Sequence, residues 1–255
     1  LILMSRQQII TLAVTAKNLL CDTRTFTNLS DISRIPYAMR LDFRPLTMLS
    51  RSVLLLFWLI GADALAQGVR NIEGCSIRRG TFCVDMNLYG ADLQSANLAN
   101  SQFTRSVLSK ANLTAANLNE ANLSSTQLRE ANLSQASLVK TNARGARFND
   151  ALLVDANLQS AILQNADLSG ANLTRAVLTS ADLTNARLDG AILDHANIQR
   201  ANMRAANLRG ASLISANLQG VDFTGANLTD ADLTEANLDQ TIFNMTHTNG
   251  CKGCP

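Results

Sequence analysis

The residues that could carry out chemistry are few, and the most informative are four cysteines. Cys75 and Cys83 lie eight positions apart, and Cys251 and Cys254 form a C-x-x-C sequence. Cysteines at such spacings form disulfides, bind zinc or exchange disulfides with other thiols. No βαβ pattern typical of a thioredoxin-like domain surrounds the C-x-x-C sequence, so redox catalysis is the weaker interpretation. The fifth cysteine, Cys21, lies far before these pairs and is assigned no role. The remaining even number favours disulfides, and four cysteines allow three pairings.

No catalytic constellation is evident in the sequence. Its only histidines are His195 and His247, which we expect to be solvated surface residues. The sequence contains neither a G-x-S-x-G elbow nor a phosphate-binding glycine-rich loop. We therefore expect no enzyme activity, no cofactor and no metal site.

A five-residue repeat must position these side chains. Every fifth residue from Leu88 to Phe243 is large and apolar except Ala143. From Leu93 onward, 24 of 31 such positions are Leu, and 25 of the 31 positions two residues earlier are Ala. The residue between them is Asn or Asp in 19 of 31 cases. In an α-helix, a period of five would place successive Leu side chains around the helix and not along one face. In a continuous strand, the odd period would place them on opposite faces of the sheet. The sequence therefore favours neither. A short extended piece followed by a bend fits, because it points Ala and Leu inward together.

Units such as Ala111-Asn112-Leu113 and Ala181-Asp182-Leu183 resemble the pentapeptide-repeat family, whose consensus is A-[DN]-L-x-x. The resemblance covers about residues 86–245. It implies an all-β fold, a right-handed quadrilateral parallel β-helix with four pentads in each coil. About eight coils, spaced about 4.8 Å apart, would make a rod of about 38 Å.

On such a rod the two cysteine pairs lie at opposite ends, whereas a disulfide requires Cα atoms within about 7 Å. The predicted bridges are therefore Cys75–Cys83 and Cys251–Cys254, and a four-cysteine zinc site is excluded. We expect both bridges to cap the open ends of the β-helix. A reduced, exposed C-terminal tail is the alternative for the second pair.

An export signal is predicted before the repeat. A short basic segment from Met48 is followed by the apolar core Val53–Ile60 and by Ala64-Leu65-Ala66, an A-x-A cleavage site before Gln67. The core is too short for a membrane anchor, which needs about 20 apolar residues. We therefore expect no stable membrane span and a location in the periplasm or outside the cell.

The signal is preceded by 47 residues, so we expect translation to start at Met48 or Met39. A cytoplasmic protein with an unusual leader is the alternative. The predicted organisation is a doubtful leader (1–47), a signal peptide (48–66), an N-terminal cap (67–87), the β-helix (88–243) and a C-terminal cap or tail (244–255).

The charged residues form a pattern if positions 20 apart stack in columns. One set of neighbouring columns, the acidic side, carries eight carboxylates against Lys110 and Arg175. Its members are Asp92, Glu130, Asp150, Asp155, Asp194, Asp230, Asp232 and Glu235. The adjacent columns, the basic side, carry seven arginines against Asp167 and Asp189: Arg105, Arg129, Arg144, Arg147, Arg187, Arg204 and Arg209. Complementary fields of this kind favour protein partners or association between rods. Ordinary mixed solvation is the alternative.

The sequence therefore favours an exported, non-catalytic structural or interaction module with an unidentified protein partner. The resemblance implies an alternative, since some cytoplasmic family members mimic DNA and protect DNA gyrase from quinolones. That role needs a strongly acidic rod, whereas residues 88–243 carry 14 acidic and 11 basic residues, a net charge of −3. Direct nucleic-acid binding is disfavoured because the repeat lacks aromatic platforms for bases.

Overall fold

The computed structural model describes residues 70–255. The predicted leader (1–47) and signal peptide (48–66), with its cleavage point after Ala66, lie outside the described residues. Within the described part, no helix is long and apolar enough to cross a membrane.

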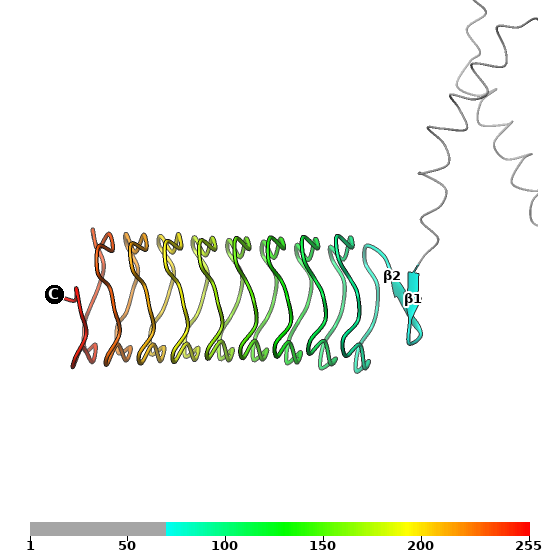
Figure 1. The fold of residues 1–255 in the computed structure, drawn as a ribbon, viewed down its shortest axis with the longest axis horizontal. Coiled ribbons are helices and arrows are strands. Elements are labelled where there is room, and N and C mark those ends of the chain that lie inside the picture. The colour runs from blue at the N-terminus through cyan, green and yellow to red at the C-terminus, as the bar shows by residue number, and fades with distance from the viewer. Residues whose placement is uncertain (1–69) are drawn as a thin grey trace, which may run out of the picture. The chain divides into compact units, whose positions relative to one another are not determined.

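A short hairpin precedes the repeat. Strands β1 (Arg70–Ile72) and β2 (Cys75–Ile77) pair antiparallel, and Ile72 lies opposite Cys75. The connecting residues Glu73 and Gly74 have φ angles of 50° and 84°, the left-handed conformation that a tight turn requires. The hairpin lies at one end of a stack of coils, and the C-terminal residues lie at the other end (Figure 1).

The stack is a four-sided parallel β-helix. The outward residue of each pentad forms a parallel bridge with the residue 20 positions later, beginning with Phe82 and Gln102 and ending with Asp232 and Lys252. Three backbone hydrogen bonds join each side to the next coil. For example, the Leu113 N–H donates to the Asn132 carbonyl at 2.7 Å. Twenty residues with a turn in every pentad make four sides, so the expected four pentads per coil are present.

The regular bridges extend beyond the predicted 88–243 segment at both ends. They begin within the predicted N-terminal cap, at Phe82, and continue to Lys252, inside the predicted cap or tail. The apolar pattern does not reveal these parts of the coil, because Cys83 and Thr248 occupy central positions that are Leu in most other pentads.

Each pentad ends in a turn whose last residue is left-handed. After Leu93, for instance, the Ala96 N–H donates to the Leu93 carbonyl at 3.1 Å, and Ser95 between them has a φ of 54°. Most of these corner residues are not glycine, so the bends do not depend on it. The outward Asn or Asp supports the turn. The Asn112 Oδ1 accepts bonds from the N–H and the hydroxyl of Thr114 at 3.2 and 2.7 Å.

Ala and Leu fill the interior of the coil. Every central residue from Leu88 to Leu233 is at most 1% exposed, including Ala143 and the neighbouring Phe148. Threonine can replace Ala because its hydroxyl reaches a carbonyl of the preceding coil. The Thr126 Oγ1, for example, donates to the Phe103 carbonyl at 2.8 Å. The rod therefore has a packed interior, and only its outer sides and its ends can contact another molecule.

Candidate interaction surfaces and cysteine pairs

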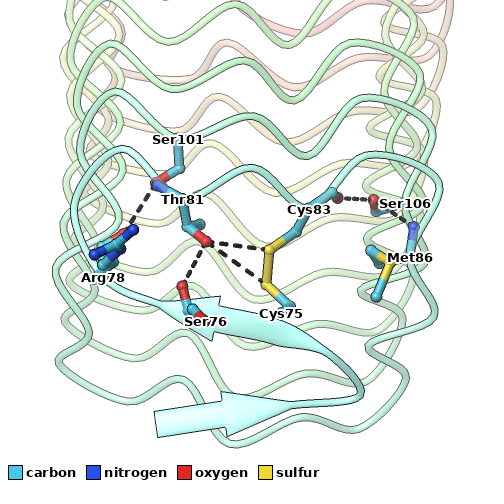
Figure 2. Close-up of a disulfide and its surroundings, with 8 residues drawn as sticks. All are labelled: Cys75, Ser76, Arg78, Thr81, Cys83, Met86, Ser101 and Ser106. Atoms are coloured by element: carbon cyan, nitrogen blue, oxygen red, sulfur yellow. Dashed lines mark hydrogen bonds between the residues drawn. A yellow bond between two sulfur atoms is a disulfide. The ribbon is translucent and has the colours of Figure 1, made fainter. Parts of the chain in front are cut away.

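The first cysteine pair ties the hairpin to the first coil. Cys75, at the start of β2, and Cys83 form a disulfide with their Cα atoms 5.5 Å apart, and both are 1% exposed. The Thr81 Oγ1 lies between the pair and β2 (Figure 2). It is 3.2 Å from the Cys83 Sγ and donates to the Ser76 carbonyl. The Ser106 hydroxyl donates to the Cys83 carbonyl, so the next coil also supports the pair.

The second cysteine pair lies in the last described coil. Cys251 and Cys254 form a disulfide with Cα atoms 5.8 Å apart, and both side chains are partly exposed. Gly253 between them has a φ of 71°, and a Cβ there would lie 2.6 Å from the Leu233 carbonyl oxygen. Only glycine therefore allows this loop to lie so close to the preceding coil. The two pairs lie at opposite ends of the rod.

The structure offers little for catalysis or metal binding among residues 70–255. No group of three or more His, Cys, Asp or Glu side chains there is arranged to hold a metal ion. His195 is an exposed corner residue with a φ of 57°. His247 occupies an outward position, is exposed, and forms a backbone bridge with Asn227. The structure does not bring the two histidines together with a nucleophile.

The predicted basic side is partly neutralised by ion pairs. Four of its seven arginines pair with carboxylates: Arg105 with Asp85, Arg187 with Asp167 and Asp189, Arg204 with Asp222, and Arg209 with Asp230. Arg144 donates instead to the Gln164 Oε1. For Arg129 and Arg147, no ion pair is present within the described part of the chain. Within residues 70–255, the charges of these two arginines are therefore not neutralised by an ion pair.

The predicted acidic side is also partly paired. Four of its carboxylates meet cations: Glu130 with Lys110, Asp155 with Arg175, Asp230 with Arg209, and Asp232 with Lys252. Asp194 accepts bonds from the Ser212 hydroxyl and the Ile214 N–H, and Glu235 accepts one from the Ser215 hydroxyl. Asn112 donates to Asp92, and Asp150 lies over Gly170. Ion pairs and hydrogen bonds to neighbouring coils therefore fix the positions of most carboxylates of the acidic side.

Local bonding shifts the pKa of several carboxyls on the rod. Arg175 donates a bidentate pair of hydrogen bonds to the Asp155 carboxylate, and these bonds hold the pKa of Asp155 below its ordinary value. Burial raises the pKa of Asp182, but hydrogen bonds from Thr184 and Gln164 outweigh it and lower the pKa overall. These carboxyls are ionised at neutral pH, so they serve as fixed charges and not as proton donors.

Two functional features were missed in the sequence. Asp85, the partner of Arg105, lies before the predicted repeat boundary, although its position 20 residues earlier in the same column could have revealed it. The antiparallel hairpin has no such signal, because its strands are three residues long and carry no period.

Comparison with known proteins places this geometry in context. The family model for pentapeptide repeats matches eight copies between residues 87 and 244. No curated protein matches the chain. Among solved structures, HetL from the cyanobacterium Nostoc sp. strain PCC 7120 is 27% identical, with 78% of this chain and 94% of HetL aligned and a TM-score of 0.40. HetL is described as a pentapeptide repeat protein involved in heterocyst differentiation regulation.

Two further solved structures are similar. Rfr23 from the cyanobacterium Cyanothece 51142 is 35% identical over 40% of this chain and 63% of its own, with a TM-score of 0.33. Full-length QnrB1, a plasmid-mediated fluoroquinolone resistance protein, is 20% identical over 67% of this chain and 92% of its own, with a TM-score of 0.50. At that identity, the likeness to QnrB1 concerns the fold alone.

Proposed function

Since the chain belongs to the pentapeptide-repeat family, we propose that it is an exported, non-catalytic interaction module that binds another protein. Members of this family are right-handed quadrilateral β-helices and generally serve as structural modules. The repeat specifies the core, whereas the outward positions vary and can be adapted to a partner. The proposed role is therefore that of a rigid rod that presents charged side chains at fixed spacings.

The observation that carries the export proposal is the position of the cysteines. All four cysteines between residues 70 and 255 are close enough to pair, one pair at each end of the rod. Disulfides persist in oxidising compartments and are rare in the cytosol. The A-x-A sequence before Gln67 supplies the route to such a compartment.

The test is N-terminal sequencing and intact mass of the protein recovered from separate cytoplasmic and exported fractions. The proposal expects an exported chain that begins at Gln67 and is about 4 Da lighter than its fully reduced form, because each disulfide removes two hydrogens. Mass after reduction under denaturing conditions is the control. A cytoplasmic chain that retains residues before Met48 and has all of its thiols free would contradict export.

The unpaired arginines of the basic side supply a second, separate test. Arg129→Glu/Arg147→Glu should abolish association between rods, or with a partner, in low-salt sedimentation, because these side chains have no ion pair within residues 70–255. Lys140→Glu/Arg200→Glu is the matched control, since it reverses the same number of charges at residues that lie on neither side. Equal loss in both variants would show only a general effect of net charge.

The acidic side supports a second candidate function, the gyrase protection implied by the family. Glu130 and Asp150 occupy the same corner column in adjacent coils, like successive charges on a phosphate backbone. Supercoiling by DNA gyrase in the presence of a quinolone, with and without the protein, tests this candidate. Recovery of the protein only from the exported fraction would contradict it, because gyrase acts in the cytoplasm.

A further inference from the structure

The two ends of the rod differ in how they are covered. At the hairpin end, the disulfide and strand β2 cover the interior, and Cys75, Cys83 and Leu88 are each 1% exposed. In the last described coil, the inward residues Leu238 and Phe243 are only partly buried. Met245 in the same coil is 86% exposed. Leu238 and Phe243 therefore present apolar surface that the equivalent residues of earlier coils bury against the next coil.

The backbone of the last coil also has unused hydrogen-bonding groups. One coil earlier, the Leu218 N–H donates to the Asn237 carbonyl, and the Asn237 N–H donates to the Ala216 carbonyl, both at 2.9 Å. The corresponding groups of the last coil are the Leu238 N–H and the Ala236 carbonyl. Neither makes a backbone hydrogen bond of this kind within the described residues. An unpaired edge of this kind is a template for an added strand.

The charge around this edge is negative. Residues 230–255 contain Asp230, Asp232, Glu235 and Asp239 against Lys252, a net charge of −3. Within the rod, five of the eight ion pairs of the described residues join positions 20 apart, so that a cation of one coil meets a carboxylate of the next. The residue one coil beyond Glu235 is Pro255, and neither Glu235 nor Asp239 forms an ion pair with a cation of residues 70–255. Glu235 and Asp239 therefore carry charges that no cation of the described residues neutralises in the way that Arg175 neutralises Asp155.

We propose that the side formed by residues 236–240 binds an extended, Lys/Arg-bearing β-strand of another protein. The added strand accepts a hydrogen bond from the Leu238 N–H and donates one to the Ala236 carbonyl. Its apolar side chains cover Leu238 and Phe243, and its cations meet Glu235 and Asp239. This inference rests on the proposed function as an interaction module, and it names the binding edge and the chemistry of the partner.

A second copy of the chain fits this edge less well. Two last coils facing each other would bring the same carboxylates together, with a net charge of −3 on each. The opposite end of a second copy offers only β1, a three-residue strand already paired with β2.

The test uses the full chain and a fluorescent peptide of alternating lysine and valine. Binding is measured by anisotropy, and its location by amide hydrogen exchange. The Leu238 amide should exchange rapidly in the free protein and slow at least about tenfold when the peptide is present. Glu235→Lys/Asp239→Lys should weaken peptide binding at least about tenfold. The matched variant Glu120→Lys/Asp150→Lys, which reverses two carboxylates far from this edge, should change it less than about twofold.

Several outcomes would overturn the proposal. These are binding without slower exchange at Leu238, equal weakening in both charge-reversal variants, or equal binding of a peptide with serine in place of valine. A Leu238 amide that is slow in the free protein at every concentration would mean that the chain itself covers the edge. Slow exchange that appears only at high protein concentration, with dimers in sedimentation, would assign the edge to a second copy. A failure of export alone would change the N-terminal sequence and leave peptide binding intact.

Discussion

Replacing Cys75 and Cys83 with serine removes the bridge between β2 and the first coil, and it should loosen that end of the rod while leaving the middle intact. The bridge closes a loop with a sequence separation of 8. Restriction of the unfolded chain by a loop of that length is worth about 2.5 kcal/mol. The Cys251–Cys254 bridge spans a separation of 3 and is worth about 1.6 kcal/mol on the same basis.

The effect should be local because each coil contacts only its neighbours, so stability is a sum of nearest-neighbour contributions. The Leu88 amide, which donates to the Val107 carbonyl at 2.7 Å, lies next to the removed bridge. A loss of about 2.5 kcal/mol should speed its exchange about 70-fold. The Leu168 amide, which bonds to the Arg187 carbonyl in the middle of the rod, should be unchanged.

Amide hydrogen exchange followed by mass spectrometry or NMR measures both positions in one experiment. The control variant Cys251→Ser/Cys254→Ser should loosen only the opposite end. In the unaltered protein, mild reductant should open the partly exposed Cys251–Cys254 bridge before the buried Cys75–Cys83 bridge. Unchanged exchange at Leu88 in the first variant would refute the reasoning, as would simultaneous loosening of both ends by either variant.

Three further predictions concern acid, corner residues and the core. Burial raises the pKa of Asp182 and Asp222, but hydrogen bonds, first among them those from the threonine two residues on, lower it overall below the ordinary value of 3.8. A lowered folded pKa stabilises the ionised form, so this stability is present above the unfolded pKa and is lost as pH falls through the folded value. The Tm should stay level between about pH 7 and 5 and fall below about pH 4; a constant Tm down to pH 2 would contradict this. Ala205 has a φ of 54°, so Ala205→Gly should stabilise the rod by about 0.5–1 kcal/mol in urea unfolding, because relief of left-handed strain outweighs the backbone entropy of glycine. Ala99→Gly at a position with negative φ should instead destabilise it, and the same sign for both would refute the role of the corner conformation. Leu168→Ala should cost about 2–5 kcal/mol, since Leu168 is 0% exposed in a packed interior; a cost below about 1 kcal/mol would show that the coil collapses around the gap.

Much of the interior could be predicted from the sequence. The five-residue period places Ala and Leu on one side of a short extended piece, and the structure buries them as expected. The twenty-residue coil came from the family resemblance, and the bridges between positions such as Asn112 and Asn132 agree with it. The charge columns follow once that coil length is known, because stacking makes positions 20 apart neighbours.

The ends of the coil were harder to predict. Cys83 and Thr248 replace Leu at central positions, so the apolar pattern stops before the backbone bridges do. The hairpin formed by β1 and β2 is too short to show a period. The sequence therefore identified the repeated core but not the structure that covers it at one end.

The inward direction of Ala and Leu follows from the sequence alone, because it depends only on the local alternation along an extended pentad. The stacking of the coils, in contrast, sets which charges are neutralised and which edge of the described residues has no neighbouring strand. Arg105 and Asp85, for example, meet only because one coil lies directly on the next. Leu238 and Phe243 are the same residue types that earlier coils bury, yet they remain partly exposed because no later coil of the described residues covers them. Burial and ion pairing depend on neighbours that are distant in sequence, so a local repeat cannot specify them.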